Sequence, residues 1–131
     1  IVPNAPVRAG ALPATPAGTP IVVTLNRFDV LQVLSDTGHG PDLTGSLVFS
    51  NRPVAVFGGA PITFVPATSV AAEHLEEQSF PVETWGSEYL LVKGKQRTSE
   101  SDLWRVVAAS DACAALVGVI GADCAFFAGL R

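Results

Sequence analysis

The chain has 131 residues, of which 48% are hydrophobic and 15% are charged, with a formal net charge of -4. One compact domain with its own hydrophobic core fits this length. Only 8 basic residues stand against 12 acidic ones, which argues against nucleic-acid binding through bulk positive charge. No apolar run is long enough to span a membrane, because glycines and Asp123 interrupt residues 112–130.

The chain contains no methionine and starts at Ile1. We therefore expect the start codon and any signal peptide to lie outside this sequence. The 12 glycines and 10 prolines, together with many β-branched residues, favour short strands joined by turns. The composition indicates an all-β protein.

Residues 1–20 carry one charge and five prolines: Pro3, Pro6, Pro13, Pro16 and Pro20. Proline has no backbone N–H to donate, so it is disfavoured in central strands. We expect a linker, or a strap across a surface, with at most one short edge strand.

From Ile21 onward, short apolar runs alternate with turn-forming residues. Residues 28–34 are largely apolar on both faces, which predicts a strand buried on both sides. Gly58 and Gly59 are expected to end a strand, and residues 69–78 could form two helical turns. The expected strands are residues 21–25, 28–34, a hairpin of 46–50 and 53–57, 88–92, 103–109, and a hairpin of 113–117 and 124–127.

These strands favour an antiparallel β-sandwich over residues 21–131, with a propeller-like blade fragment as the alternative. Hairpins at fairly regular spacing are compatible with both architectures.

Four strings of residues occur in the order LNRFDVLQV (25–33), DLTGSLVFSNRPVAVFGG (42–59), HLEEQSFPVETWGSEYLL (74–91) and DLWRVVAAS (102–110). In this order they resemble the N-terminal domain of IgGFc-binding protein, which is also widespread in secreted and surface proteins of bacteria. The resemblance implies a non-catalytic, extracellular, β-rich module for binding, adhesion or assembly. It also implies that residues 21–131 are part of a longer domain.

Cys113 and Cys124 lie symmetrically about the turn of the predicted C-terminal hairpin. Residues directly opposite each other on adjacent strands are close enough for a disulfide if the register suits it. The alternative is a pair of buried free thiols. The secreted context implied by the resemblance favours the disulfide.

Two polar clusters are weak candidates for metal binding or catalysis. Asp36, His39 and Asp42 share a glycine-rich loop, yet they supply fewer carboxylates than calcium sites use. His74 with Glu76 and Glu77 lacks a second histidine at metalloprotease spacing. The alternative interpretation is a solvated loop for the first cluster and a structural role for the second. An enzyme would need a pocket that joins His39, His74 and carboxylates.

Lys93, Lys95 and Arg97 would form a cationic stripe on an extended segment, suited to an acidic glycan or protein. The alternative interpretation is that these side chains form a solvated face or protect a strand edge.

Trp85 and Trp104 are either binding platforms or, more often for large aromatic residues, core anchors. No nucleophile elbow or phosphate loop occurs. We expect a non-enzymatic, secreted or cell-surface module that binds a protein or glycan and needs no cofactor. The alternative is a fibre or sheath subunit that self-assembles by strand addition.

Overall fold

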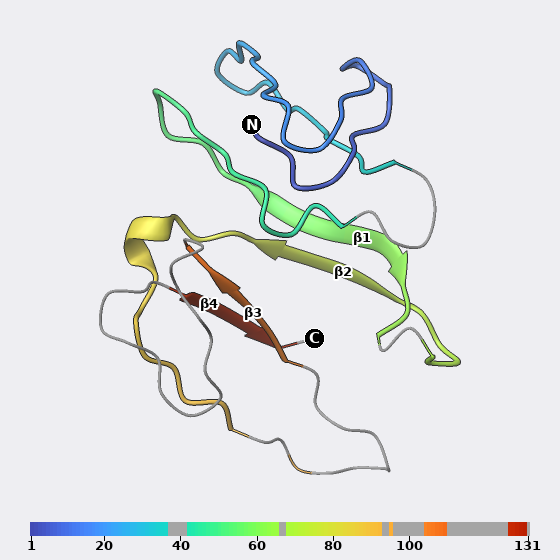
Figure 1. Cartoon of the computed structure of the whole chain (residues 1–131), viewed down its shortest axis with the longest axis vertical. Helices are drawn as coiled ribbons and strands as arrows, with labels where there is room; N and C mark the ends of the chain where they lie inside the picture. The colour runs from blue at the N-terminus through green and yellow to red at the C-terminus, as the bar shows by residue number, and fades with distance from the viewer. Residues whose placement is uncertain (37–41, 66–67, 93–94, 96–103, 110–125, 131) are drawn as a thin grey trace. The chain divides into compact units, whose positions relative to one another are not determined.

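The computed structural model describes residues 1–36, 42–65, 68–92, 95, 104–109 and 126–130 (Figure 1). Its regular elements in those residues are β1 (Phe57–Thr63), β2 (Glu73–Gln78), the 3₁₀ turn η1 (Val82–Thr84), β3 (Trp104–Ala108) and β4 (Phe126–Leu130). Strands β1 and β2 pair antiparallel, as do β3 and β4. The expected all-β class is confirmed, whereas the stacking of sheets into a sandwich or blade stays a prediction.

The chain divides into two compact units, Ile1–Pro53 and Val54–Arg131. No helix in the described residues has the length and hydrophobicity needed to cross a bilayer. The described residues of the first unit form isolated antiparallel bridges and no regular strand, and the second unit contains both strand pairs.

Residues 1–8 form an extended segment at the centre of the first unit, and one of its sides faces residues 15–21. Ile1 and Ile21 exchange two backbone hydrogen bonds, of 2.9 and 2.8 Å. Val7 and Thr15 exchange two more, of 2.8 and 3.0 Å. These pairs share one antiparallel register, so the proline-rich start of the chain folds back along itself.

The other side of residues 1–8 faces two later parts of the unit. Val2 and Leu47 exchange backbone hydrogen bonds of 2.8 and 2.9 Å, and the Arg8 N–H donates to the Leu34 carbonyl at 2.9 Å. The odd-numbered residues thus bond to residues 15–21, and the even-numbered residues bond to the later segments around Leu34 and Leu47. Bonding on both sides is the pattern of a central β-strand.

The side chains of residues 1–8 also alternate. Pro3, Ala5 and Val7 are buried, while Asn4 and Arg8 are exposed. Pro3 keeps its place because only its carbonyl is used, as the acceptor of a 2.7 Å bond from the Gly18 N–H. The residues expected to form a strap therefore supply much of the interior of this unit.

A turn replaces the start of the strand expected at residues 28–34. The Asp29 N–H donates to the Asn26 carbonyl at 3.1 Å, and the Asn26 N–H donates to Asp29 Oδ2 at 2.8 Å. Phe28 has a φ of 73°. Residues 30–34 are extended but form no strand except a bridge at Ser35, and Val30 is 92% exposed. The prediction of a strand buried on both sides is wrong, because this segment pairs with a neighbour only at its end.

The hairpin expected from residues 46–50 and 53–57 does not form a ladder. The chain bends at Asn51 and Arg52, where the Ser50 hydroxyl donates to the Arg52 carbonyl at 2.7 Å. Beyond the bend, the strand β1 begins only at Phe57. The bend was correctly placed, but the pairing was wrong because Leu47 bonds to Val2 instead.

Strand β1 runs straight through the two glycines that were expected to end a strand. Gly58 lies opposite Glu77, and Gly59 lies opposite Glu76. A Cβ atom on Gly59 would collide with the Leu75 carbonyl. This prediction is wrong because a missing side chain at position 59 lets the two backbones approach closely.

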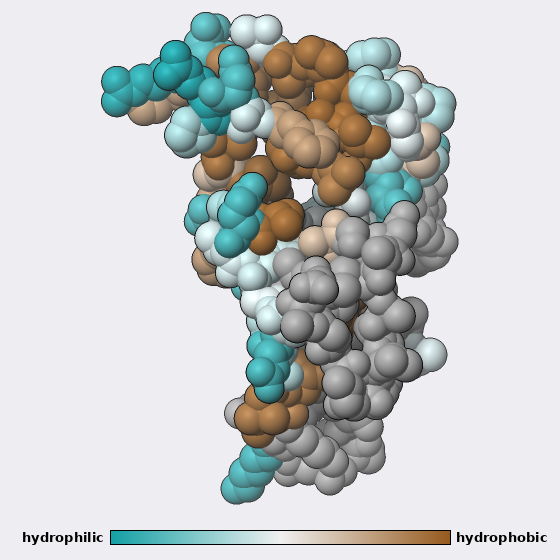
Figure 2. All heavy atoms as spheres, turned by 60° about the vertical axis from the view of Figure 1, so that its left-hand side comes forward, coloured by the Kyte–Doolittle hydropathy of each residue, from teal (hydrophilic) through white to brown (hydrophobic). Residues whose placement is uncertain are grey.

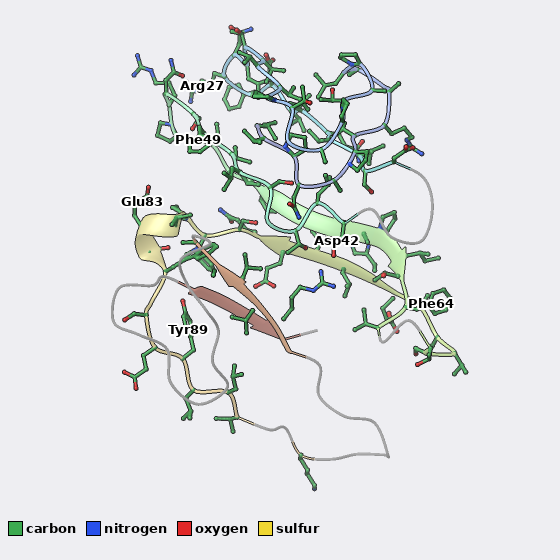
Figure 3. All side chains as sticks on the ribbon, in the orientation of Figure 1. Arg27, Asp42, Phe49, Phe64, Glu83 and Tyr89 are labelled. Atoms are coloured by element: carbon green, nitrogen blue, oxygen red, sulfur yellow. The ribbon has the colours of Figure 1, made fainter. Side chains whose placement is uncertain are left out.

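The possible helix at residues 69–78 is also wrong, since β2 occupies Glu73–Gln78. The backbone groups of β2 pair with β1, and this pairing stabilises a strand more than the weak helical pattern favours a helix. Residues 88–92, expected as a strand, are extended but belong to no strand. In the same loop the Tyr89 hydroxyl accepts a 2.8 Å hydrogen bond from the Gly86 N–H, and Figure 3 shows the Tyr89 side chain turned back along the chain.

Strand β3 confirms the strand expected at residues 103–109, with Val106 opposite Ala128 of β4. The proposed partner of the C-terminal strand, residues 113–117, lies outside the described residues. The part of the C-terminal hairpin that is described, β4, pairs with β3.

Candidate functional site

An apolar cavity of about 300 Å³ opens on the first unit, at the end of its central segment. We call it the N-terminal groove. Its lining contains no acidic or basic side chain and consists of Ile1, Val2, Pro20, Ile21, Val22, Val23 and Phe49. The lining comes from three stretches of chain that lie far apart in the sequence.

The hydrogen bonds of the first unit explain the position of the groove. The central segment starts at Ile1, which bonds to Ile21, and Val2 bonds to Leu47. Both flanking stretches continue beyond these bonds, as residues 22–25 on one side and 48–50 on the other, and neither belongs to a strand. The groove therefore lies where the line of residues 1–8 extends between two extended segments.

Hydrophobic side chains around the groove are open to solvent. Val22 is 92% exposed and Phe49 is 73% exposed, with Val23, Leu25 and Val48 exposed to a lesser degree. Figure 2 shows hydrophobic side chains lying open on the molecular surface beside hydrophilic ones, and Figure 3 shows Phe49 on its extended segment. Clustered exposed apolar side chains of this kind are typical of interaction surfaces.

The turn that follows the groove presents a second exposed aromatic ring. Phe28 is 85% exposed, and the guanidinium carbon of Arg27 lies 4.7 Å from the centroid of its ring. A bulky residue at positive φ is an outlier in folded proteins. Such strained positions cluster at functional sites, and aromatic residues and arginine are enriched in protein interfaces.

A comparison with protein families matches residues 1–118 to the family described as IgGFc binding protein. The chain belongs to this family. The match includes residues 1–20, which lie before the first of the strings that carry the resemblance. Comparisons with curated proteins and with solved structures gave no match.

Several site residues predicted for this IgGFc binding protein family member lie outside the described residues: His39, Lys93, Arg97, Cys113 and Cys124. Lys95 is exposed. The disulfide and the cationic stripe stay predictions. Trp104 lies in β3 opposite Leu130.

The remaining candidates are placed as follows. Asp36 uses its N–H to donate to the Pro6 carbonyl at 2.9 Å, and Asp42 Oδ1 accepts from the Thr44 N–H at 2.9 Å. Within the described residues, no three His, Cys, Asp or Glu side chains form a group that could hold a metal ion.

His74 and Glu76 share one face of β2, with Nε2 and Oε2 3.3 Å apart and both side chains more than 60% exposed. The Trp85 indole N–H donates to the Phe80 carbonyl at 3.1 Å, and the residue is half-buried. These contacts lie in the second unit, and none of the four residues lines the groove.

Sequence reasoning did not include the N-terminal groove or Phe28 among the site residues. Two signals were available. Residues 21–25 read IVVTL, an uncharged and mostly β-branched run, and residues 1–8 alternate buried and exposed types at a period of two.

Proposed function

We propose that this chain is a non-catalytic module of a secreted or surface-displayed bacterial protein, and that it binds another protein through the turn carrying Arg27 and Phe28. The observation that carries the proposal is the 85% exposure of a phenylalanine held at positive φ under an arginine. Membership of a family described by binding supports it. A glycan contact through Lys93, Lys95 and Arg97 is the alternative surface for such a module.

A titration of the immobilised chain tests this proposal. The ligands are the Fc fragment of IgG, a panel of extracellular proteins and a sulfated glycan set. We expect saturable binding to a protein, weakened at least about tenfold by Phe28→Lys, since aromatic anchors at interface centres account for about 2 kcal/mol or more. Val70→Lys is the control, because Val70 is fully exposed in the other unit. Equal binding by both variants and the unmodified chain would contradict the proposal.

A second function is supported by a different observation. Residues 22–25 and 48–50 are exposed and belong to no strand. Such open edges add strands from other chains unless they are protected. We infer that copies of the chain assemble by strand addition, as subunits of a fibre or sheath. Sedimentation across a concentration series tests this, with association expected and a monomer at every concentration as the contradicting result.

A further inference from the structure

We propose that the turn carrying Arg27 and Phe28 recognises a carboxylate side chain that lies beside an apolar side chain on the protein partner. This inference rests on the proposed function, which assigns the binding surface to the turn, and it adds the chemistry of the partner. Arg27 contacts the carboxylate, and Phe28 contacts the apolar side chain.

Hydrogen bonds within the turn hold its backbone in one conformation. Asp29 Oδ2 accepts from the Asn26 N–H at 2.8 Å and from the Asn26 side-chain amide at 3.3 Å. The Asp29 N–H donates back to the Asn26 carbonyl at 3.1 Å. Between these two residues, Phe28 has its φ of 73°. The turn thus presents Arg27 and Phe28 in an arrangement that is formed before a partner binds, which lowers the entropy cost of binding.

The guanidinium group of Arg27 keeps its hydrogen-bond donors for a partner. Its central carbon lies over the Phe28 ring, 4.7 Å from the centroid. Within the described residues, the Arg27 side chain forms no hydrogen bond or ion pair. The N–H donors of a guanidinium lie in its plane, so a contact between its face and a ring leaves them available. Two of these donors match the two oxygens of a carboxylate.

The ring of Phe28 adds the requirement for an apolar neighbour. Phe28 is 85% exposed, and Val30 is 92% exposed. An apolar side chain that covers this ring removes apolar surface from water on both partners, which is favourable. Because the guanidinium carbon and the ring centroid are 4.7 Å apart, neighbouring residues of the partner, whose Cα atoms are about 3.8 Å apart, can contact both groups.

The charge of the chain favours a protein carboxylate over a sulfated glycan. Sulfated glycans bind to clusters of basic residues, whereas this chain has a net charge of -4. In residues 24–30, TLNRFDV, Arg27 is the one basic residue, and Asp29 adds a negative charge. A single carboxylate beside an apolar side chain therefore matches the turn better than a row of sulfate groups.

A random peptide library displayed on phage tests the chemistry of the partner. The library is selected on the full chain and, in parallel, on the Arg27→Gln and Phe28→Lys variants. We expect the peptides that are lost on both variants to carry Asp or Glu next to an aromatic or large aliphatic residue. Arg8→Gln is the matched control and should keep these peptides, because Arg8 is another exposed arginine of the same unit. Circular dichroism checks that the variants keep their fold.

A double-mutant cycle with the strongest selected peptide tests the pairing itself. Fluorescence anisotropy measures the Kd of the peptide. We expect Arg27→Gln, and replacement of the acidic residue of the peptide by its amide, each to weaken binding about tenfold. The two changes together should weaken binding little further. Arg27→Lys should not restore binding, because lysine keeps the charge but lacks the planar pair of donors.

The outcomes separate this inference from the proposed function. Selected peptides without an acidic residue, or additive effects in the cycle, would overturn the carboxylate assignment while a loss of binding by Phe28→Lys still supported the proposed function. A library that yields no peptide dependent on Phe28 would contradict both together. Binding of heparin that depends on Arg27, without such peptides, would assign the turn to a sulfated glycan and overturn the inference.

Discussion

Ile1 and Ile21 lie side by side and exchange two backbone hydrogen bonds, 2.9 and 2.8 Å long. This pairing closes a loop that contains all five prolines of the first twenty residues. It also aligns residues 22–25 along one wall of the N-terminal groove. The stability of the first unit and the shape of its groove therefore depend on the same contacts.

Val7→Ala should destabilise the first unit. Val7 is only 3% exposed and bonds through its backbone to Thr15, so removing two methyl groups leaves a small cavity. We expect a loss of about 1 to 3 kcal/mol in the free energy of unfolding, measured by hydrogen exchange of the Thr15 amide. Val22→Ala, at a 92% exposed site, should change it by less than about 0.5 kcal/mol. Equal effects would place Val7 outside the core.

Gly59→Ala should weaken the pairing of β1 with β2, whereas Gly58→Ala should not. A Cβ atom at position 59 meets the Leu75 carbonyl, while at position 58 it meets open space. We expect a loss of about 1 to 3 kcal/mol for Gly59→Ala. For Gly58→Ala we expect a neutral effect or a gain below about 1 kcal/mol, because alanine restricts the unfolded chain.

Urea denaturation of these two glycine variants gives the comparison directly. Both variants replace a glycine of β1 by alanine at adjacent positions, so the effects of the alanine's intrinsic strand propensity are the same in both and cancel in the comparison. If Gly58→Ala were the more damaging change, the register between β1 and β2 would be wrong.

Phe28→Gly should be more stable than Phe28→Ala by about 1 kcal/mol. Both variants lose the contact between Arg27 and the aromatic ring, so that loss cancels in the comparison. What differs is the cost of a Cβ atom at a φ of 73°, which glycine avoids. Midpoints of urea unfolding measure the difference, and an alanine variant as stable as the glycine variant would mean that the turn is not left-handed in solution.

His74→Ala should change the free energy of unfolding by less than about 0.5 kcal/mol. The pair of His74 and Glu76 is 3.3 Å apart, but both side chains are more than 60% exposed, and water screens such pairs. Thermal unfolding at low and high salt gives the measurement, with Glu76→Gln as the matched variant. A loss above about 1 kcal/mol in either variant would assign the pair a structural role that its exposure does not suggest.

Local features of this protein could be predicted from its sequence. The all-β class followed from composition, because β-branched residues, glycines and prolines favour strands and turns. The bend at Asn51 and Arg52 and the strand at residues 103–109 followed from local turn chemistry and apolar runs. The family followed from four ordered strings of residues and is shown by the match to residues 1–118.

The predictions that failed concern which segments pair. Residues 46–50 were assigned to residues 53–57, yet Leu47 bonds to Val2. Residues 28–34 were predicted to form a strand buried on both sides, yet Val30 is exposed. Residues 69–78 were given two possible helical turns, yet residues 73–78 form β2.

Residue preferences for extended and turn conformations can be read along the chain, because they reside in each residue's own side chain and φ. The tertiary structure alone decided that the proline-rich residues 1–8 form the centre of a unit and that a groove continues their line. Ladder hydrogen bonds use backbone groups that nearly every residue carries. Pairing between distant segments therefore leaves little trace in residue types and is set by which segments bury their apolar sides together.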